Sequence, residues 1–304
     1  MAATRVKVIV NPVAGAYATR RKWPIISRLL EHIGLAFDFQ YTEGTGHAIE
    51  LARAAASDGY RYLVAVGGDG TVNEVANGIL HSTNASGTAL GIVSTGTGSD
   101  FIRSVGIARD FPSACSVLTS SRRLVIDVGV VEYQSQGKTL QRFFINGAGA
   151  GFDAAVVKET ERLPKYFGGT IPYLGGLLRA LVGYKNKAVV VNTEDETMSG
   201  RVLNVVVANG GYLGGGMHIA PEAKLCDSLL DVVMIGDLGK LELIKELPTV
   251  YKGTHINHPK VRMVKAKRIT ITSPERMLVH ADGELLGECP ASFWIMPAAL
   301  SLVV

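Results

Sequence analysis

The sequence predicts an α/β + β fold, in which an N-terminal doubly wound domain with a parallel sheet precedes a mostly antiparallel β domain. The first 121 residues alternate short apolar runs with helical segments, which is typical of a parallel sheet with right-handed crossovers. After residue 121, strand-like runs follow one another with turn residues between them. A chain of 304 residues, 47% hydrophobic and 19% charged, is long and apolar enough to form two cores.

The N-terminal elements follow from their apolar patterns. Residues 6–10 form a largely apolar run, as expected of a strand that is covered on both faces, and Asn11-Pro12 ends it. Further strands are predicted over 36–42, 62–66 and 90–93, and helices over 20–33, 47–56 and 72–80. Residues 1–121 are therefore expected to form the first domain.

The second domain is expected to span residues 122–290. Its strands are predicted over 125–133, 141–145, 188–192, 202–208, 230–235, 268–272 and 277–281, and its helices over 153–163, 173–184 and 240–251. The last segment, 291–304, is apolar again and can close either domain, including by returning to the first.

Composition narrows the class of protein. A net charge of +4 is too mild to indicate nucleic-acid binding. Cys115, Cys226 and Cys289 lie far apart without metal-ligand spacing, so we expect a reducing, cytoplasmic location rather than a disulfide framework. The long uncharged stretch 202–221 contains five glycines and is interpreted as a strand followed by a loop, so no membrane-spanning helix is expected.

The strongest chemical signal is the turn at residues 67–71, Gly-Gly-Asp-Gly-Thr, between a predicted strand and a helix. Glycines allow the backbone to approach phosphate oxygens, and a helix N-terminus attracts anions. A carboxylate at Asp69 would repel phosphate unless a cation lies between them, so it indicates a divalent metal ion or a role in proton transfer. Thr71 and Glu74 have the spacing of a capping box.

Three further loops follow the other strands of the predicted parallel sheet, at residues 11–15, 42–47 and 94–100. Each is rich in small or hydroxyl residues. Because parallel strands present such loops at the same edge of a sheet, the four loops together predict a phosphate-binding site. Neither the P-loop pattern nor Gly-x-Gly-x-x-Gly occurs there.

A separate Asp-Gly-Glu segment lies at residues 282–284. By itself this segment is typical of a hairpin turn between strands.

In their order along the chain, these motifs resemble the catalytic domain of diacylglycerol kinases, and most closely the small bacterial lipid kinases of the superfamily that includes sphingosine and ceramide kinases. The matching segments are 11–15, Thr42 with His47, 67–74 and 95–100, followed by 209–217, 220–223, 229–231 and 282–284. The resemblance therefore covers nearly the whole chain. Gly-Gly-Asp-Gly alone is shared with NAD kinases and phosphofructokinases, whereas the ordered set is much more restrictive.

The resemblance implies a β-sandwich for the second domain and ATP and Mg²⁺ as cofactors. The positions that match ATP-binding residues are Asn11, Pro12, Gly15, Thr42, Gly67, Gly68, Asp69, Gly70, Thr71, Glu74, Thr95, Gly96 and Thr97.

It also implies the catalytic and metal-binding positions. The turn at 282–284 supplies the acid–base group, which can be Asp282 or Glu284. Asp69 is expected to act in catalysis and, with Asp100 and Asp127, to organise magnesium. A structural magnesium is implied at Asp227, with the carbonyls of Lys224 and Leu229 as ligands.

Two positions depart from the family pattern. Ser99 stands where the family usually has Asn, and Cys226-Asp227-Ser228 stands where it commonly has Asp-Asp-Gly. Serine at 228 removes easy access to positive φ, so this departure bears directly on the implied structural metal site.

The lipid side carries weaker signals. Residues 166–178 can form a lid over an acyl chain or a core helix, and the basic residues between 260 and 268 can contact anionic headgroups or line a solvated strand edge. A lipid kinase that is cytoplasmic and peripherally bound to the membrane surface is the leading hypothesis. The alternatives are a kinase for a soluble acceptor such as NAD and a regulator without catalysis. The sequence allows a homodimer and identifies no particular lipid.

Overall fold

The computed structural model describes residues 5–162 and 170–304. The chain divides into two compact units, one of Met1–Ile126 with Ala298–Val304 and one of Asp127–Pro297. The sequence places a boundary after residue 121, whereas the structure divides the chain after residue 126 and again after residue 297.

The first unit contains a parallel sheet in the order β2-β1-β3-β4, with the end of β14 beside β4. In this sheet Val8 pairs with Phe39 on one side and with Val64 on the other. Ser301 and Leu302 of β14 run parallel to β4. The strands are β1 (Val6–Val10), β2 (Phe37–Tyr41), β3 (Tyr62–Gly67), β4 (Ala89–Ser94) and β14 (Glu284–Val303).

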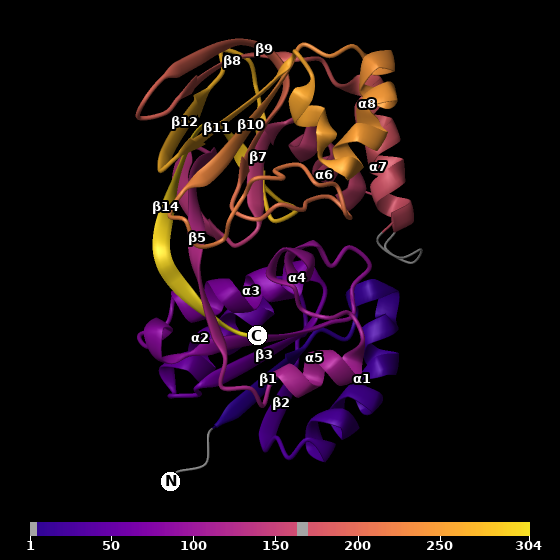
Figure 1. Ribbon diagram of the computed structural model, residues 1–304, viewed down its shortest axis with the longest axis vertical. Coiled ribbons are helices and arrows are strands. Elements are labelled where there is room, and N and C mark those ends of the chain that lie inside the picture. The colour runs from indigo at the N-terminus through magenta and orange to yellow at the C-terminus, as the bar shows by residue number, and fades with distance from the viewer. Residues whose placement is uncertain (1–4, 163–169) are drawn as a thin grey trace. The chain divides into compact units, whose positions relative to one another are not determined.

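Helices cover both faces of this sheet, as a doubly wound fold requires (Figure 1). Trp23, Ile26 and Leu30 of α1 pack with Val8 and with α5 on one face. On the other face α2 and α3 pack closely against each other. The helices are α1 (Ala14–His32), α2 (His47–Ser57), α3 (Asp69–Leu80), α4 (Asp100–Val105) and α5 (Phe111–Val117). The predicted fold class of this part is confirmed.

The second unit is built from antiparallel strands, which follow the order β11-β10-β9-β7-β13-β14. β8 pairs with β9 and with β12, β12 pairs with β14, and β5 pairs with β6. The strands are β5 (Arg123–Ser135), β6 (Lys138–Phe144), β7 (Gly147–Gly151), β8 (Lys187–Asn192), β9 (Thr197–Ala208), β10 (Leu230–Gly236), β11 (Val261–Ala266), β12 (Arg268–Thr272) and β13 (Leu278–Ala281). The predicted antiparallel β domain is also confirmed.

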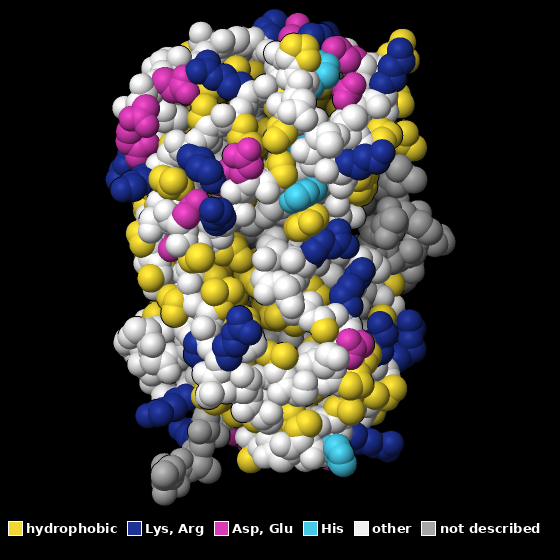
Figure 2. Space-filling model, viewed as in Figure 1, with side chains coloured by type: hydrophobic (Ala, Val, Ile, Leu, Met, Phe, Trp, Pro, Cys, Tyr) yellow, Lys and Arg dark blue, Asp and Glu magenta, His cyan; other side chains and the backbone are white. Residues whose placement is uncertain are grey.

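Two apolar clusters stabilise the second unit. One lies among the strands and includes Phe144, Val205 and Phe293. The other joins the strands to the helices α6 (Phe152–Glu161), α7 (Thr170–Gly183) and α8 (Lys240–Lys252). On the face in Figure 2, Lys and Arg side chains are scattered among Asp and Glu, in keeping with the small net charge of +4.

Some local expectations are corrected. α1 includes a kink at its start, where Gly15, Ala16 and Tyr17 have positive φ, so its regular helical backbone follows Tyr17 and begins slightly before the expected residue 20. The sequence pattern does not predict β7, Gly-Ala-Gly-Ala-Gly, because glycine and alanine rarely favour strands. The first part of the expected lid at 166–178 lies outside the described residues, and its remainder belongs to α7. No helix in the described ranges has the length and apolar character that a bilayer span requires.

Candidate functional site in the nucleotide-type unit

The turn at residues 67–71 connects β3 directly to α3 and is held by Asn11. Helix α3 begins at Asp69 with Gly68 as its N-cap, and no side chain caps it. The capping role expected of Thr71 is therefore wrong. Thr71 is buried instead, and its Oγ1 accepts a hydrogen bond from Asn11 Nδ2 at 2.9 Å. This bond joins the loop after β1 to the turn after β3, as the predicted site requires.

Glu74 also differs from the capping-box expectation. Its carboxylate accepts hydrogen bonds from the backbone N–H of Gly46 at 2.9 Å and of Ala48 at 3.2 Å. These donors lie at the start of α2, in the loop that follows Thr42. Glu74 thus caps α2 rather than its own helix, and it ties the second loop to the third.

The loop at 95–97 lies against the turn at 67–71. A Cβ on Gly96 would come within 2.7 Å of Gly68 Cα, so this close approach of two backbones requires glycine at residue 96. Thr95 is buried, and its Oγ1 lies 2.5 Å from Thr19 Oγ1. The carbonyl of Thr97 accepts a hydrogen bond from Arg109. The loops at 11–15, 67–71 and 95–97 therefore meet. Their small residues and the N-terminus of α3 form a surface suited to phosphate oxygens.

Asp69 connects this surface to α4. Its two carboxylate oxygens accept N–H groups of Asp100 at 3.3 Å and Phe101 at 3.2 Å. Ser99, the N-cap of α4, has a φ of 55°, a conformation that Asn adopts more easily than Ser. The Ser99 hydroxyl compensates through a 2.9 Å contact with Ser94. Asp69 and Asp100 are thus brought together at the end of the sheet.

The other predicted magnesium residue, Asp127, belongs to the second unit. It is buried, and its carboxylate accepts the N–H of Ser228 at 2.7 Å. Ser228 has a φ of 60°, so this bond holds serine in the conformation that the family's glycine adopts freely.

Candidate acid–base residues in the β-rich unit

Asp282 lies in the turn between β13 and β14 and is surrounded by backbone donors. Its carboxylate accepts N–H groups from Ile145 at 2.8 Å, Asn146 at 3.1 Å and Gly147 at 2.8 Å. Its own N–H donates to the carbonyl of Gly147. Asp282 therefore fixes the conformation of the turn, and with a φ of 45° it does so in the left-handed region.

Glu284 forms a different kind of contact. Its Oε2 lies 2.7 Å from Arg142 Nη2, and the two side chains are 29% and 19% exposed. The carboxylate is thus partly accessible and held by a cation. Sequence reasoning does not single out Arg142, because one arginine in a strand carries no motif.

His280 is a buried neighbour of this turn that the sequence analysis did not assign to the site. Its Nε2 lies 2.9 Å from Asp153 Oδ2 as an ion pair, although the two atoms are not aligned as a hydrogen bond. Burial would lower the pKa of His280, but Asp153 and Asp282 outweigh it and raise the pKa. A Cβ on Gly149 would come within 2.1 Å of Asp153 Oδ2, so β7 needs glycine there.

Of the residues expected to hold a structural magnesium, Asp227 lies beside a lysine ammonium. Lys265 Nζ lies 2.9 Å from Asp231 Oδ2, 3.4 Å from Asp227 Oδ2 and 3.2 Å from the carbonyl oxygen of Glu222. Burial raises the pKa of Asp231, and Lys265 opposes that shift. In this arrangement the Lys265 ammonium neutralises the two carboxylates, so the residues fit an internal ion pair better than a metal-binding site.

We expect Lys265→Met to lower the free energy of unfolding by about 3–5 kcal/mol, because it leaves the buried Asp231 carboxylate without its cation. EDTA is expected to leave the urea unfolding midpoint of the wild-type protein unchanged. Lys260→Met is a matched control, since Lys260 pairs with Glu242 at an exposed position. A loss of stability in EDTA as large as that of Lys265→Met would contradict this assignment.

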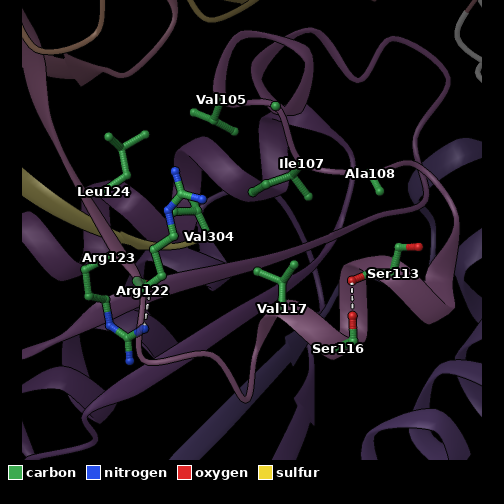
Figure 3. Close-up of a pocket in the computed structure, with 11 residues that line it drawn as sticks. Val105, Ile107, Ala108, Ser113, Ser116, Val117, Arg122, Arg123, Leu124 and Val304 are labelled. Carbon is green, nitrogen blue, oxygen red and sulfur yellow. Dashed lines mark hydrogen bonds between the residues drawn. The ribbon is translucent and has the colours of Figure 1, made fainter.

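Within the described ranges, no group of three or more His, Cys, Asp or Glu side chains is arranged to hold a metal ion. A cavity of about 460 Å³ lies elsewhere in the first unit, beside α4, α5 and the start of β5 (Figure 3). Its lining combines apolar side chains such as Ile107 and Leu124 with Arg122, and it contains none of the residues predicted to bind nucleotide. The candidate site is therefore defined by the loops and turns rather than by this cavity.

Comparison with known proteins supports one family throughout. The diacylglycerol kinase catalytic domain family matches residues 5–131, and the YegS C-terminal NAD kinase beta sandwich-like domain matches residues 146–304. A diacylglycerol kinase of Staphylococcus saprophyticus is 31% identical over 289 residues, which cover 95% of this chain and 92% of that protein. One from Staphylococcus carnosus is 29% identical, with coverage of 95% and 91%.

A crystal structure of a diacylglycerol kinase from Bacillus anthracis has the same fold, with a TM-score of 0.75 and 22% identity over 100% of this chain and 97% of that one. At that identity the likeness bears on the fold alone. The match of both domain families, together with a relative 31% identical over nearly the full length, shows that the chain belongs to the diacylglycerol kinase family of lipid kinases.

Proposed function

We propose that the protein transfers the terminal phosphate of ATP to the hydroxyl of a diacylglycerol-like lipid at a membrane surface. The observation that carries the proposal is the joined set of loops at the end of the parallel sheet. In this set Asn11 donates a hydrogen bond to Thr71, and Gly96 packs on Gly68. The Asp69 carboxylate accepts a hydrogen bond from the start of α4. Such a surface suits a polyphosphate, and membership of the family supports a lipid acceptor.

The proposed roles in the first unit follow from these contacts. Backbone N–H groups of residues 67–71 and 96–97 bind the phosphate groups. The Asn11–Thr71 hydrogen bond holds the loop after β1 against the turn at 67–71. Glu74 orders the loop after Thr42 through Gly46 and Ala48, so that the loops present one surface. These loops would orient the phosphate donor, ATP, and such positioning is a main requirement of phosphoryl transfer.

Mg²⁺ fits this arrangement as an ion that arrives with the nucleotide. The Asp69 carboxylate accepts the N–H of Asp100, so the two acidic residues adjoin at the end of the sheet. Mg²⁺ is commonly bound by one or two carboxylates together with substrate phosphates. When bound, the ion would neutralise charge on the phosphates. We propose Asp69 and Asp100 as its protein ligands, and Asp127 as a residue that positions the 225–228 loop.

For the acid–base role we propose Glu284 rather than Asp282. Three backbone N–H groups already bond to the Asp282 carboxylate, which leaves it little capacity to accept a substrate proton. Glu284 is partly exposed, and Arg142 holds it in one orientation. Glu284 would take the proton of the attacking hydroxyl, as general-base catalysis requires.

Transfer of radiolabelled phosphate from ATP to a panel of lipids tests the proposal, with NAD as the control acceptor. We expect label in diacylglycerol or a closely related lipid alcohol, and no label when magnesium is chelated. Label in NAD and in no lipid would instead identify a kinase for a soluble acceptor. No label in any acceptor, from protein that still binds ATP, would favour a regulator.

A further inference from the structure

Helix α8 has an exposed face that contains apolar and basic side chains but no acid. Leu241 is 77% exposed, Ile244 48% and Tyr251 52%. At the helical spacing of 3.6 residues these positions lie on one side of α8, together with the exposed Lys245 and Lys252. Like an ordinary surface helix, α8 also buries apolar side chains, Leu243 and Val250, so the exposed Leu241, Ile244 and Tyr251 form a second apolar side.

The acidic residues of α8 are turned to another side and are occupied. Glu242 Oε2 lies 2.7 Å from Lys260 Nζ, and Glu242 also accepts the N–H of Gly239. Glu246 accepts the hydroxyl of Thr249 at 2.9 Å. The exposed face is therefore apolar and positively charged, whereas the helix as a whole is not strongly basic.

The end of α7 continues this face. Lys240 Nζ donates to the carbonyl of Val182 at 2.6 Å, which joins the start of α8 to the end of α7. Val182 is 77% exposed, and Leu178, one helical turn before it, is 55% exposed. We call the set Leu178, Val182, Leu241, Ile244, Lys245, Tyr251 and Lys252 the docking face. In Figure 2, hydrophobic and basic side chains lie along the edge of the second unit where Figure 1 draws α7 and α8.

We propose that the docking face binds an anionic lipid bilayer, with the apolar side chains in the acyl boundary and the lysines at the phosphates. Charge complementarity favours an anionic bilayer as the partner. The docking face combines large apolar residues with lysines and contains no acidic residue, as is typical of interfacial helices. Lysine stems can lie along apolar surface while the ammonium groups reach the headgroups. The inference rests on the proposed function, since it explains how the kinase reaches a lipid substrate.

Sedimentation with vesicles of phosphatidylglycerol and phosphatidylcholine, without ATP, tests the docking face. Lys245→Gln with Lys252→Gln is expected to weaken binding roughly thirty-fold, given about 1 kcal/mol for each basic residue near an anionic surface. Leu241→Ser with Ile244→Ser should weaken it by about ten-fold or more. Vesicles of phosphatidylcholine alone should bind the wild-type protein weakly.

Leu140→Ser with Lys138→Gln is the matched control, because both residues are exposed on β6, away from α7 and α8. Equal binding by the docking-face variants and the wild-type protein would overturn the proposal, as would an equal loss in the control. Unchanged vesicle binding with a shift from dimer to monomer would show instead that the face joins two copies of the chain.

Phosphate transfer to a short-chain diacylglycerol dispersed in detergent separates the two proposals. The docking-face variants should retain wild-type rates there, because α7 and α8 take no part in the proposed chemistry. Retained vesicle binding without transfer to any lipid would refute the proposed function and leave the docking face intact. Transfer at the wild-type rate from vesicles by these variants would refute the docking face alone.

Discussion

Asp69→Ala is expected to lower the rate of phosphate transfer about a thousand-fold, because the loss of a carboxylate that organises a metal ion costs several kcal/mol in the transition state. The same change removes the two hydrogen bonds from the N–H groups of Asp100 and Phe101. Steady-state kinetics with saturating ATP and lipid measure the effect. Circular dichroism should show that the fold persists, since most of the core lies away from this turn.

Asp69→Asn distinguishes the two roles of this side chain. The amide oxygen can still accept an N–H from the start of α4, whereas the negative charge is lost. If Asp69 organises a metal ion, the Asn variant should be nearly as slow as the Ala variant. Recovery of most activity in Asp69→Asn would show that the side chain only orders α4.

Glu284→Gln is expected to lower kcat by about 10²–10⁴, the range that general-base catalysis contributes. Glutamine retains the shape of the side chain and cannot take a proton. Asp282→Asn should behave differently, because it weakens bonds to the N–H groups of residues 145–147 and is expected to reduce stability as well as activity. Turnover numbers and urea unfolding curves for both variants separate a chemical effect from a structural one.

Glu288→Gln is the control for Glu284→Gln. Glu288 also lies on β14 and pairs with an arginine, Arg276, but the pair is well exposed. Exposed ion pairs contribute little to stability, so this variant should retain both stability and turnover. Wild-type kcat in Glu284→Gln would refute the proposed base and transfer that role to Asp282.

Much of the fold could be predicted from local patterns. Buried parallel strands are largely apolar runs, and β1, β3 and β4 carry this signal, whereas β2 is mostly exposed and alternates. β7 lacks it, because each of its glycines lies against a close neighbour: Leu213 at Gly147, Asp153 at Gly149 and the Leu203 carbonyl at Gly151. The start of α1 is obscured in the same way, since Gly15, Ala16 and Tyr17 adopt a left-handed backbone that no periodic pattern reports.

The candidate site shows a similar division. Motif spacing identifies which loops meet, but not which side chain bonds to which donor. The sequence suggests that Glu74 caps its own helix, yet the packing of α2 on α3 offers it the N–H groups of Gly46 and Ala48. The partners of Lys265 and Arg142 could not be found from sequence. Pairing of β10 with β11 brings Asp231 to Lys265, and Arg142 meets Glu284 from a distant part of the chain.

Lys265 also affects how metal dependence should be interpreted in this protein. Because the Lys265 ammonium lies beside Asp231 and Asp227, we expect folding not to draw on dissolved magnesium. A titration of the reaction rate against magnesium should then report only the ions that accompany the nucleotide. No structural magnesium ions would contribute to it. For a kinase of this family, that separation would let the number of catalytic ions be counted from kinetics alone.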